Sequence, residues 1–516
     1  MMHGAGAARN GGDESGSSTP EEPLGFVVDN STPVIARFVS SNPPPVGDYV
    51  VIEHPDGAIL GMVEQVGTRS ITLNALPGVY DPTIVEKLSA EMGDEDVFFE
   101  CTARLLGTVG SLRMPRLPPL PGARVYRAPS SMLENVFGGK EPYWVRLGVL
   151  ASRPDVPVYV NVNKLVTRHT AILAVTGAGK SNTVAIIVDR LVRHGGTVLI
   201  FDFHGEYVSS NLGGRVNVIE PVLNPRLLSV SELMILLGIE QRYYNQERVL
   251  RKALSQLRES GSEERGGFLE TLASIVERMA HRRREESTAA TAVVNKIESL
   301  QERYSDIIRD DAVDPVSRIR PGYANVVNLS RIDRDAADAV VSHMLRIVLA
   351  ERKRHKLTGS SQIPFPILIV VEEAHILAPG DEDTLSKYWL TRIAREGRKF
   401  GAGLILVSQR PKGLDPEILS QANNLIVLRI VEPSDQRYIQ AASESLSDDL
   451  VAHLPSLNTG EAVVIGPFIR IPALVQIDRY EGHLGGADID VVAEWESLRR
   501  TIDETTTVDD FVSEFM

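Results

Sequence analysis

The chain has 516 residues, of which 43% are hydrophobic and 24% are charged, and its formal net charge is −14. This composition is typical of a globular protein with about two to four domains, and no apolar run approaches the roughly 18 residues that span a bilayer. The acidic balance argues against an outer surface that coats nucleic acid, although a locally basic channel remains compatible with it.

Two features near the start of the chain bear on its environment. Cys101 is the single cysteine, so no internal disulfide can form, and the N-terminus lacks the basic-then-apolar pattern of a signal peptide. We therefore expect a cytoplasmic protein without a membrane partner. Residues 1–23 are rich in Gly, Ala, Ser and Glu, and we expect a disordered tail there.

Short apolar segments separated by turn residues follow from Leu24 to about Val109. Their spacing and a Pro-Asp-Gly turn at 55–57 predict a small antiparallel β-barrel. The Pro-dense stretch 114–122 predicts an extended linker that marks a domain boundary. We assign 24–128 to the barrel and linker, and 129–480 to a second domain.

A phosphate-binding loop is the most specific motif of this second domain. The apolar run 170–174 leads into Gly177, Gly179, Lys180 and Ser181, and an amphipathic segment leads out. In such a strand–turn–helix, glycines let backbone N–H groups surround a phosphate, lysine reaches the β- and γ-phosphates, and serine coordinates Mg²⁺. The first glycine of the usual motif is replaced by Ala174, a small residue that the turn tolerates. The sequence therefore predicts a nucleotide site.

The segment after the P-loop helix predicts a second buried strand, 196–202, which ends in Asp202. Acidic groups at the carboxyl ends of strands face ligands in open α/β sheets. From about 224 to 322 the pattern is mainly helical, so we expect a helical insertion between the second and third strands of the sheet.

Farther along, the apolar run 366–371 ends in Glu372 and Glu373. Two carboxylates at a strand tip after a P-loop are typical of a Walker B element, in which Glu372 would act on Mg²⁺ through water and Glu373 would polarise the attacking water. His375 has no second metal-type residue beside it, so we expect it to make structural hydrogen bonds.

A further strand, 404–408, precedes Gln409, which suits a sensor of the γ-phosphate. Before that strand lies a basic segment with Arg395 and Arg398. Two interpretations stay open for this segment: a solvated face, or an arginine finger that reaches a neighbour's nucleotide.

Together these motifs resemble the HerA family of hexameric DNA translocases and helicases. The residues that carry the resemblance are Thr176-Gly-Ala-Gly-Lys-Ser-Asn182, Phe201-Asp-Phe-His-Gly-Glu-Tyr207, Glu372-Glu-Ala-His375, Arg395-Glu-Gly-Arg398 and Ser408-Gln-Arg-Pro411, behind a small β-barrel. The resemblance covers about 24–480. It implies a RecA-like P-loop ATPase core of the α/β class preceded by a HAS-barrel, a ring of six subunits with double-stranded DNA in its pore, and a NurA-type nuclease partner in double-strand break end resection and recombinational repair.

The resemblance also implies roles for individual residues. Glu373 would be the catalytic base, Gln409 the sensor, Arg398 the finger supplied in trans with Arg395 second, and Asp202 an assisting group. Ser181 and Glu372 would serve Mg²⁺. The residues implied to bind ATP are Thr176, Gly177, Ala178, Gly179, Lys180, Ser181, Asn182 and, just before the P-loop strand, Arg168. Residues 481–516 would form a C-terminal brace and tail. An ATP-gated DNA clamp or scaffold, and a protein-translocating motor of the conjugation or secretion type, remain alternatives.

Overall fold

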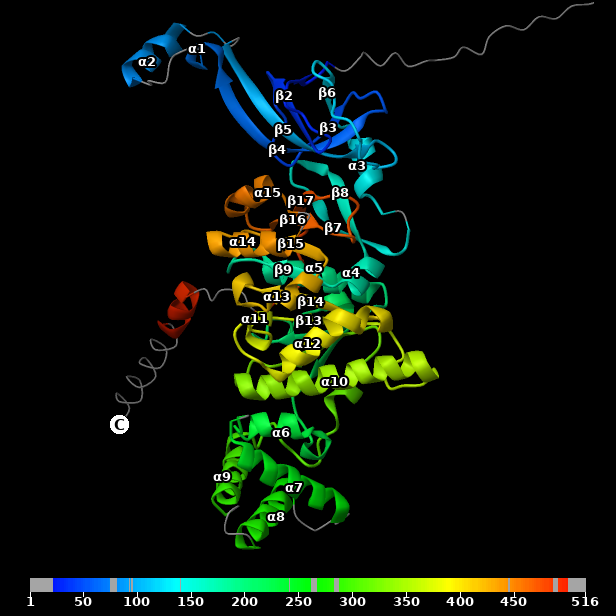
Figure 1. Ribbon diagram of the computed structural model, residues 1–516, viewed down its shortest axis with the longest axis vertical. Coiled ribbons are helices and arrows are strands. Elements are labelled where there is room, and N and C mark those ends of the chain that lie inside the picture. Colours follow the sequence, from blue (N-terminus) through cyan, green and yellow to red (C-terminus); the bar gives the residue numbers. More distant parts are fainter. Residues whose placement is uncertain are drawn as a thin grey trace, which may run out of the picture. The chain divides into compact units, whose positions relative to one another are not determined.

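The computed structural model describes residues 22–74, 81–91, 93, 96–139, 141–240, 242–260, 267–282, 287–443, 446–485 and 491–499 (Figure 1). The chain divides into two compact units, one within Met1–Val136 and Ala151–Val156, the other within Phe137–Leu150 and Pro157–Met516. The tails predicted at 1–23 and 481–516 lie mostly outside the described residues.

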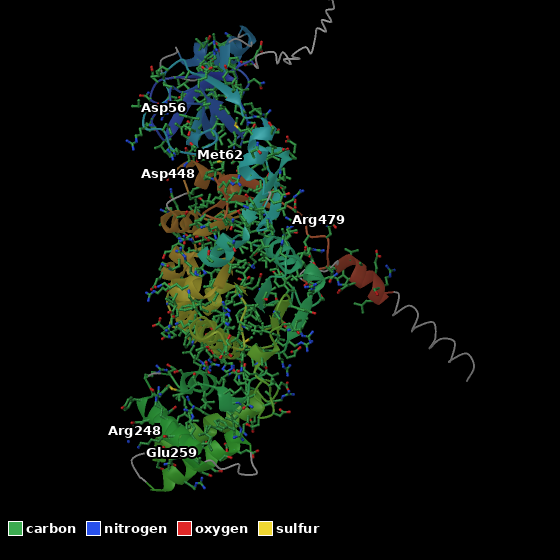
Figure 2. All side chains as sticks on the ribbon, turned by 90° about the vertical axis from the view of Figure 1, so that its right-hand side faces the viewer. Asp56, Met62, Arg248, Glu259, Asp448 and Arg479 are labelled. Atoms are coloured by element: carbon green, nitrogen blue, oxygen red, sulfur yellow. The ribbon has the colours of Figure 1, made fainter. Side chains whose placement is uncertain are left out.

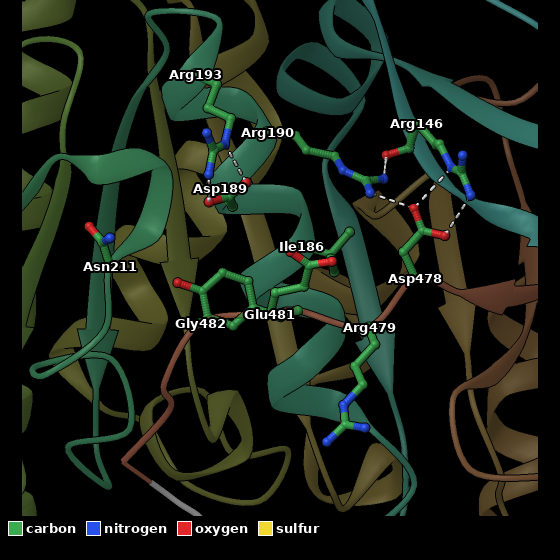
Figure 3. A pocket seen from close by; sticks show the side chains of 11 residues that line it. Arg146, Ile186, Asp189, Arg190, Arg193, Asn211, Asp478, Arg479, Glu481 and Gly482 are labelled. Atoms are coloured by element: carbon green, nitrogen blue, oxygen red, sulfur yellow. Dashed lines mark hydrogen bonds and ion pairs between the residues drawn. The ribbon is translucent and has the colours of Figure 1, made fainter.

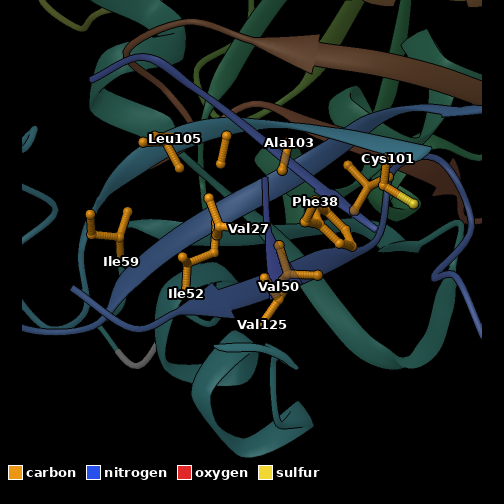
Figure 4. Packing of buried hydrophobic residues seen from close by; sticks show 11 residues of the cluster. Val27, Phe38, Val50, Ile52, Ile59, Cys101, Ala103, Leu105 and Val125 are labelled. Carbon is orange, nitrogen blue, oxygen red and sulfur yellow. The ribbon is translucent and has the colours of Figure 1, made fainter. Parts of the chain in front are cut away.

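The first unit is a closed barrel with the strand order β1-β2-β5-β4-β3-β6, which confirms the predicted β-barrel. Alternating apolar residues of its strands point inward, and Phe38, Ile52 and Cys101 are among those fully buried in its core (Figure 4). Its elements are β1 (Gly25–Val27), β2 (Ile35–Ser40), β3 (Tyr49–Ile52), β4 (Ile59–Ser70), α1 (Ile71–Asn74), α2 (Pro82–Glu91), β5 (Val97–Thr108), β6 (Arg124–Arg127) and α3 (Ser130–Phe137).

The Pro-dense stretch 114–122 does not mark a domain boundary, and that prediction was wrong. β6 follows this stretch and pairs antiparallel with both β1 and β3, so the stretch connects two strands of one barrel. Proline fixes the local backbone but carries no information about which strand the next segment joins. The chain first leaves the barrel unit after Val136 and returns to it for Ala151–Val156.

The second unit is built on an 11-stranded sheet with the order β11-β12-β10-β13-β14-β9-β15-β16-β17-β7-β8. The strands from β11 to β15 are parallel, and β16, β17 and β7 continue the sheet antiparallel. Parallel neighbours place their carboxyl ends at one edge, which is where open α/β sheets bind ligands. The strands are β7 (Trp144–Leu150), β8 (Arg153–Asn161), β9 (Thr170–Leu173), β10 (Thr197–Asp202), β11 (Val216–Ile219), β12 (Ala324–Asn328), β13 (Ile367–Val371), β14 (Ala402–Ser408), β15 (Asn424–Val427), β16 (Glu461–Ile465) and β17 (Ala473–Ile477).

Helices α6 to α9 follow β11 and precede β12 in the chain, which confirms the predicted helical insertion. Figure 1 shows these helices grouped together. In α9, Ala290, Val293, Ile297 and Leu300 are buried at the spacing of one helix face. The helices of the second unit are α4 (Val162–Arg168), α5 (Lys180–Arg193), α6 (Val230–Leu236), α7 (Tyr244–Ser260), α8 (Phe268–Arg282), α9 (Ser287–Arg303), α10 (Arg334–Thr358), α11 (Ala374–Leu377), α12 (Leu385–Glu396), α13 (Pro416–Gln421), α14 (Pro433–Ala442) and α15 (Asp448–His453).

A buried charged cluster joins the insertion to the core. Glu232 on α6 accepts hydrogen bonds from Arg346 Nε (2.9 Å) on α10 and lies 3.4 Å from His343 Nδ1 on the same helix. On its other side, His343 Nε2 lies 3.6 Å from Asp314 Oδ1. The histidine is therefore held between two carboxylates at the base of the insertion.

Candidate active site

The P-loop connects β9, between β14 and β15 in the sheet, to the N-terminus of α5. Gly177 (φ +76°) and Gly179 (φ +106°) adopt left-handed conformations that residues with a Cβ rarely reach. A Cβ on Gly179 would also come within 3.3 Å of the backbone nitrogen of Gly460. These two glycines thus produce the turn that brings Lys180 to the first position of the helix.

Four side chains form a hydrogen-bonded chain across the carboxyl ends of β9, β14 and β13. Lys180 Nζ lies 2.6 Å from Glu373 Oε1, and Gln409 Nε2 donates to the same oxygen at 2.8 Å. Thr176 Oγ1 in turn donates to Gln409 Oε1 at 2.7 Å. Burial would raise the pKa of Glu373, but Lys180 outweighs this effect and lowers it, so the carboxylate stays ionised. The structure brings together the predicted phosphate-binding lysine, base and sensor.

The backbone of Glu373 is itself unusual, with φ +44° and ψ +46° at the N-cap of α11. A left-handed conformation costs a residue with a side chain about 1–3 kcal/mol and persists where the surrounding structure enforces it, often at functional sites. His204 Nε2 lies 3.5 Å from Glu373 Oε1, and His375 Nδ1 lies 3.4 Å from Glu373 Oε2. His375 also contacts Ser408 Oγ at 3.3 Å, which confirms the structural hydrogen bond expected of it.

Glu372, one residue earlier, is almost fully buried and accepts a hydrogen bond from the Tyr207 hydroxyl at 2.7 Å. Burial raises the pKa of Glu372 to about 7, against the opposing effects of Lys180 and Tyr207. Its carboxylate and the Ser181 hydroxyl, in the first turn of α5, are hard oxygen donors that suit Mg²⁺. Within the described part of the chain no group of three or more His, Cys, Asp or Glu residues could hold a metal ion.

Asp202, at the end of β10, makes contacts that the sequence did not predict. Its Oδ1 accepts from the backbone N–H groups of His204, Gly205 and Glu206, and its Oδ2 accepts from Tyr207 N at 2.9 Å. Burial raises the pKa of Asp202 despite these four donors. The structure thus gives Asp202 the task of holding the turn 203–207, which carries His204 toward Glu373 and Tyr207 toward Glu372.

Asn182 likewise has partners other than a nucleotide. Its Nδ2 donates to Asp478 O at 2.9 Å, and its Oδ1 accepts from Tyr480 N at 2.8 Å. We call residues 478–485 the strap: this segment follows β17, crosses α5, and ends with Gly485 N donating to Glu206 O at 2.8 Å (Figure 3). The strap therefore contacts both the P-loop helix and the turn 203–207.

A cavity of about 810 Å³ lies between the strap and α5 (Figure 3). Asp478 pairs there with Arg146 (3.0 Å) and with Arg190, so two guanidinium groups share one carboxylate. Arg479 is exposed and has no ion-pair partner among the described residues (Figure 2). Because Asp478 belongs to the strap and Arg190 to α5, their ion pair anchors the strap on α5.

The three arginines considered as nucleotide contacts precede strands of the sheet, whereas the P-loop follows one. Arg168 ends α4 directly before β9, and Arg398 lies in a 3-10 helix (Gly397–Phe400) directly before β14, whereas the P-loop and Gln409 follow those strands. Arg395 forms an ion pair with Glu417, while the exposed Arg398 has no such partner among the residues described. The length of these strands therefore separates Arg168 and Arg398 from the P-loop.

Comparisons with known proteins agree with this architecture. The family described as "Helicase HerA, central domain" matches residues 145–348, and the HAS barrel domain family matches residues 12–109. The chain is 43% identical over 490 residues to the DNA double-strand break repair helicase HerA of Sulfolobus acidocaldarius, covering 92% of this chain and 97% of that protein. It is 32% identical to the protein of the same name from Pyrococcus furiosus, over 90% of this chain and 94% of that protein.

Solved structures share the fold at lower identity. The plasmid coupling protein TrwB in complex with the ATP analogue ADPNP superposes with a TM-score of 0.51 at 14% identity, covering 70% of this chain and 94% of that chain. VirB4 of Thermoanaerobacter pseudethanolicus gives 0.50 at 17% identity, over 67% of this chain and 99% of that chain. In the described part of the chain, no helix combines the length and apolar character needed to cross a membrane.

Proposed function

Because the chain belongs to the HerA family, we propose that it is an ATP-driven hexameric DNA translocase and helicase that acts in the cytoplasm on double-stranded DNA. We further propose that it works with a NurA-type nuclease in end resection and recombinational repair of double-strand breaks. The family relationship supports these proposals, and the site geometry supports the ATPase step.

The observation that best supports the proposal is that Lys180 and Gln409 both lie within hydrogen-bond distance of Glu373 Oε1. A triphosphate in the P-loop would bring its own negative charge to Lys180 and free Glu373 from this ion pair. Glu373 would then accept a proton from water as the water oxygen bonds to the γ-phosphorus and the bond from that phosphorus to the bridging oxygen breaks. ADP and phosphate are the products. Mg²⁺, held by Ser181 and Glu372, would neutralise charge on the phosphate oxygens.

A ring explains why the candidate arginines lie opposite the P-loop. Suppose that the strand ends that carry Arg398 face the strand ends that carry the P-loop of the next subunit. Arg398 then completes that neighbour's nucleotide site, and repeating this head-to-tail contact closes a ring. An arginine supplied in trans stabilises the charge of the transition state, with effects of about 10³–10⁵ on rate in other phosphoryl-transfer enzymes. Arg168 would be a second contact from the same edge.

The test is ATP turnover with and without duplex DNA, measured together with the mass of the assembly and the displacement of a protein roadblock from that DNA. We predict a six-subunit assembly, DNA-stimulated turnover and ATP-dependent displacement. Lys180→Ala should keep the assembly and lose the other two. Turnover that ignores DNA and displaces nothing would favour an ATP-gated clamp or scaffold. Addition of a purified NurA-type nuclease tests the partnership separately, through ATP-dependent resection of duplex ends.

A further inference from the structure

Tyr207 is a fully buried tyrosine whose hydroxyl hydrogen-bonds to one of the two acidic residues of the site. Its hydroxyl donates to Glu372 Oε1 at 2.7 Å, although the two residues lie 165 positions apart in the chain. The Glu372 side chain has no second hydrogen-bond partner among the described residues. One oxygen is thus engaged by the protein, and the other is left for a ligand.

The backbone around Tyr207 is held as firmly as its side chain. Its N–H donates to Asp202 Oδ2 at 2.9 Å, and its carbonyl accepts from Ser210 Oγ at 2.6 Å. Asp202 also holds the three preceding N–H groups of the turn. Because its hydrogen-bonded neighbours fix both ends of the residue, the hydroxyl is directed at Glu372 before any ligand arrives.

We propose that Tyr207 is a positioning residue that orients the Glu372 carboxylate toward Mg²⁺, with Asp202 as the residue that sets Tyr207 in place. A neutral phenol satisfies one oxygen of a buried carboxylate without cancelling its charge, so the second oxygen keeps its attraction for a cation. Outer partners of this kind orient metal ligands, and their loss typically lowers metal affinity about 10- to 100-fold. This inference rests on the proposed Mg²⁺–ATP site but not on DNA translocation.

The test measures binding of a fluorescent ATP analogue to the full chain, in EDTA and across a Mg²⁺ titration, alongside ATP turnover. Tyr207→Phe removes only the hydroxyl. We expect its affinity in EDTA to match wild type, while the Mg²⁺ concentration for half-maximal binding and turnover rises about tenfold. The matched control is Tyr304→Phe, which removes a buried hydroxyl hydrogen-bonded to Asp333 (2.8 Å) in the same unit and should leave the Mg²⁺ dependence unchanged.

Two further variants keep the inference falsifiable if Tyr207→Phe folds poorly. Asp202→Asn leaves a single good acceptor oxygen for four N–H groups and should shift the Mg²⁺ dependence in the same direction. In a Glu372→Gln background, Tyr207→Phe should cause no further shift, because the two residues act through one carboxylate.

The results separate the two levels of the proposal. Wild type without any Mg²⁺-dependent nucleotide binding would contradict the proposed ATPase site. The positioning role alone would be overturned if wild type bound nucleotide in a Mg²⁺-dependent way but Tyr207→Phe and Asp202→Asn left the half-maximal Mg²⁺ concentration unchanged. It would also be overturned if Tyr207→Phe shifted that concentration as much in the Glu372→Gln background as in wild type.

Discussion

Lys180 Nζ lies 2.6 Å from Glu373 Oε1, and the two side chains are only 8% and 5% exposed. The cation of the phosphate-binding loop and the proposed catalytic base thus form a buried ion pair. Lys180 lowers the pKa of Glu373 and so stabilises its carboxylate in a place where the charge is poorly hydrated. In the proposed ATPase, a nucleotide in the P-loop would replace Glu373 as the partner of Lys180 and thereby release the base.

Replacing Glu373 by Gln should separate binding from hydrolysis. The amide cannot accept a proton from water, so we expect ATP turnover to fall about 10²- to 10⁴-fold. Nucleotide affinity should be retained or increased, because Lys180 loses its competing anion. Turnover assays and titration with a fluorescent nucleotide measure the two effects. Glu247→Gln, which alters an ion pair with Arg251 on α7, is the control; unchanged turnover in Glu373→Gln would rule out its role as base.

Replacing Asn182 by Ala should loosen the strap. The change removes two hydrogen bonds, to Asp478 O and from Tyr480 N, and we expect the local opening free energy of residues 478–485 to fall by about 1–3 kcal/mol. Hydrogen–deuterium exchange of peptides from the strap measures this directly. Asn217→Ala, which removes hydrogen bonds to Arg318 O and Asn325 Oδ1 elsewhere in the unit, should leave exchange of the strap unchanged. Equal exchange in wild type and Asn182→Ala would show that other contacts hold it.

The cluster at the base of the helical insertion predicts a pH dependence. Burial would lower the pKa of His343, but Asp314 and Glu232 outweigh it and raise the pKa above the ordinary 6.5. Burial would raise the pKa of Glu232, but hydrogen bonds from His343 and Arg346 lower it from 4.5 to about 2. The stabilisation that His343 adds to the free energy of unfolding is complete below pH 6.5 and is lost as pH rises through its folded pKa. The stabilisation that Glu232 adds is complete above pH 4.5 and is lost as pH falls toward 2.

Exchange of α6 amides, corrected for the intrinsic rate, tests this dependence. From about pH 6 to about pH 9, wild type should lose protection of α6 while His343→Gln shows a flatter profile, because its neutral amide does not titrate. Parallel profiles for the two proteins would mean that His343 carries no folding-linked charge.

Local patterns predicted the parts of the site that lie within one strand and the turn after it. The glycines around Lys180, the acidic pair after β13 and Gln409 after β14 each follow an apolar run, and parallel strands must bring such ends to one edge. The barrel was predicted in the same way, from short apolar runs and turn residues.

Contacts between distant segments could not be predicted from such patterns. Nothing near Tyr207 indicates that its hydroxyl meets Glu372, and nothing near Asn182 indicates that the strap returns to it. Strand β6 was missed as part of the barrel for the same reason, since its partners β1 and β3 precede a Pro-dense connection. Asp202 shows a further limit: an acidic residue at a strand end suggests a ligand contact, yet four backbone N–H groups occupy its carboxylate.

The most direct measurement of the central claim, a site built from Lys180 and Glu373 of one subunit and closed by an arginine of the next, is ATP turnover in mixtures of two inactive variants. Lys180→Ala keeps the arginine, and Arg398→Ala keeps the P-loop. Random mixing in equal amounts would give about one interface in four with both groups intact. We predict that each variant alone is inactive and that the mixture recovers part of the wild-type turnover. No recovery in mixed rings, verified by mass, would contradict a nucleotide site shared between subunits through Arg398.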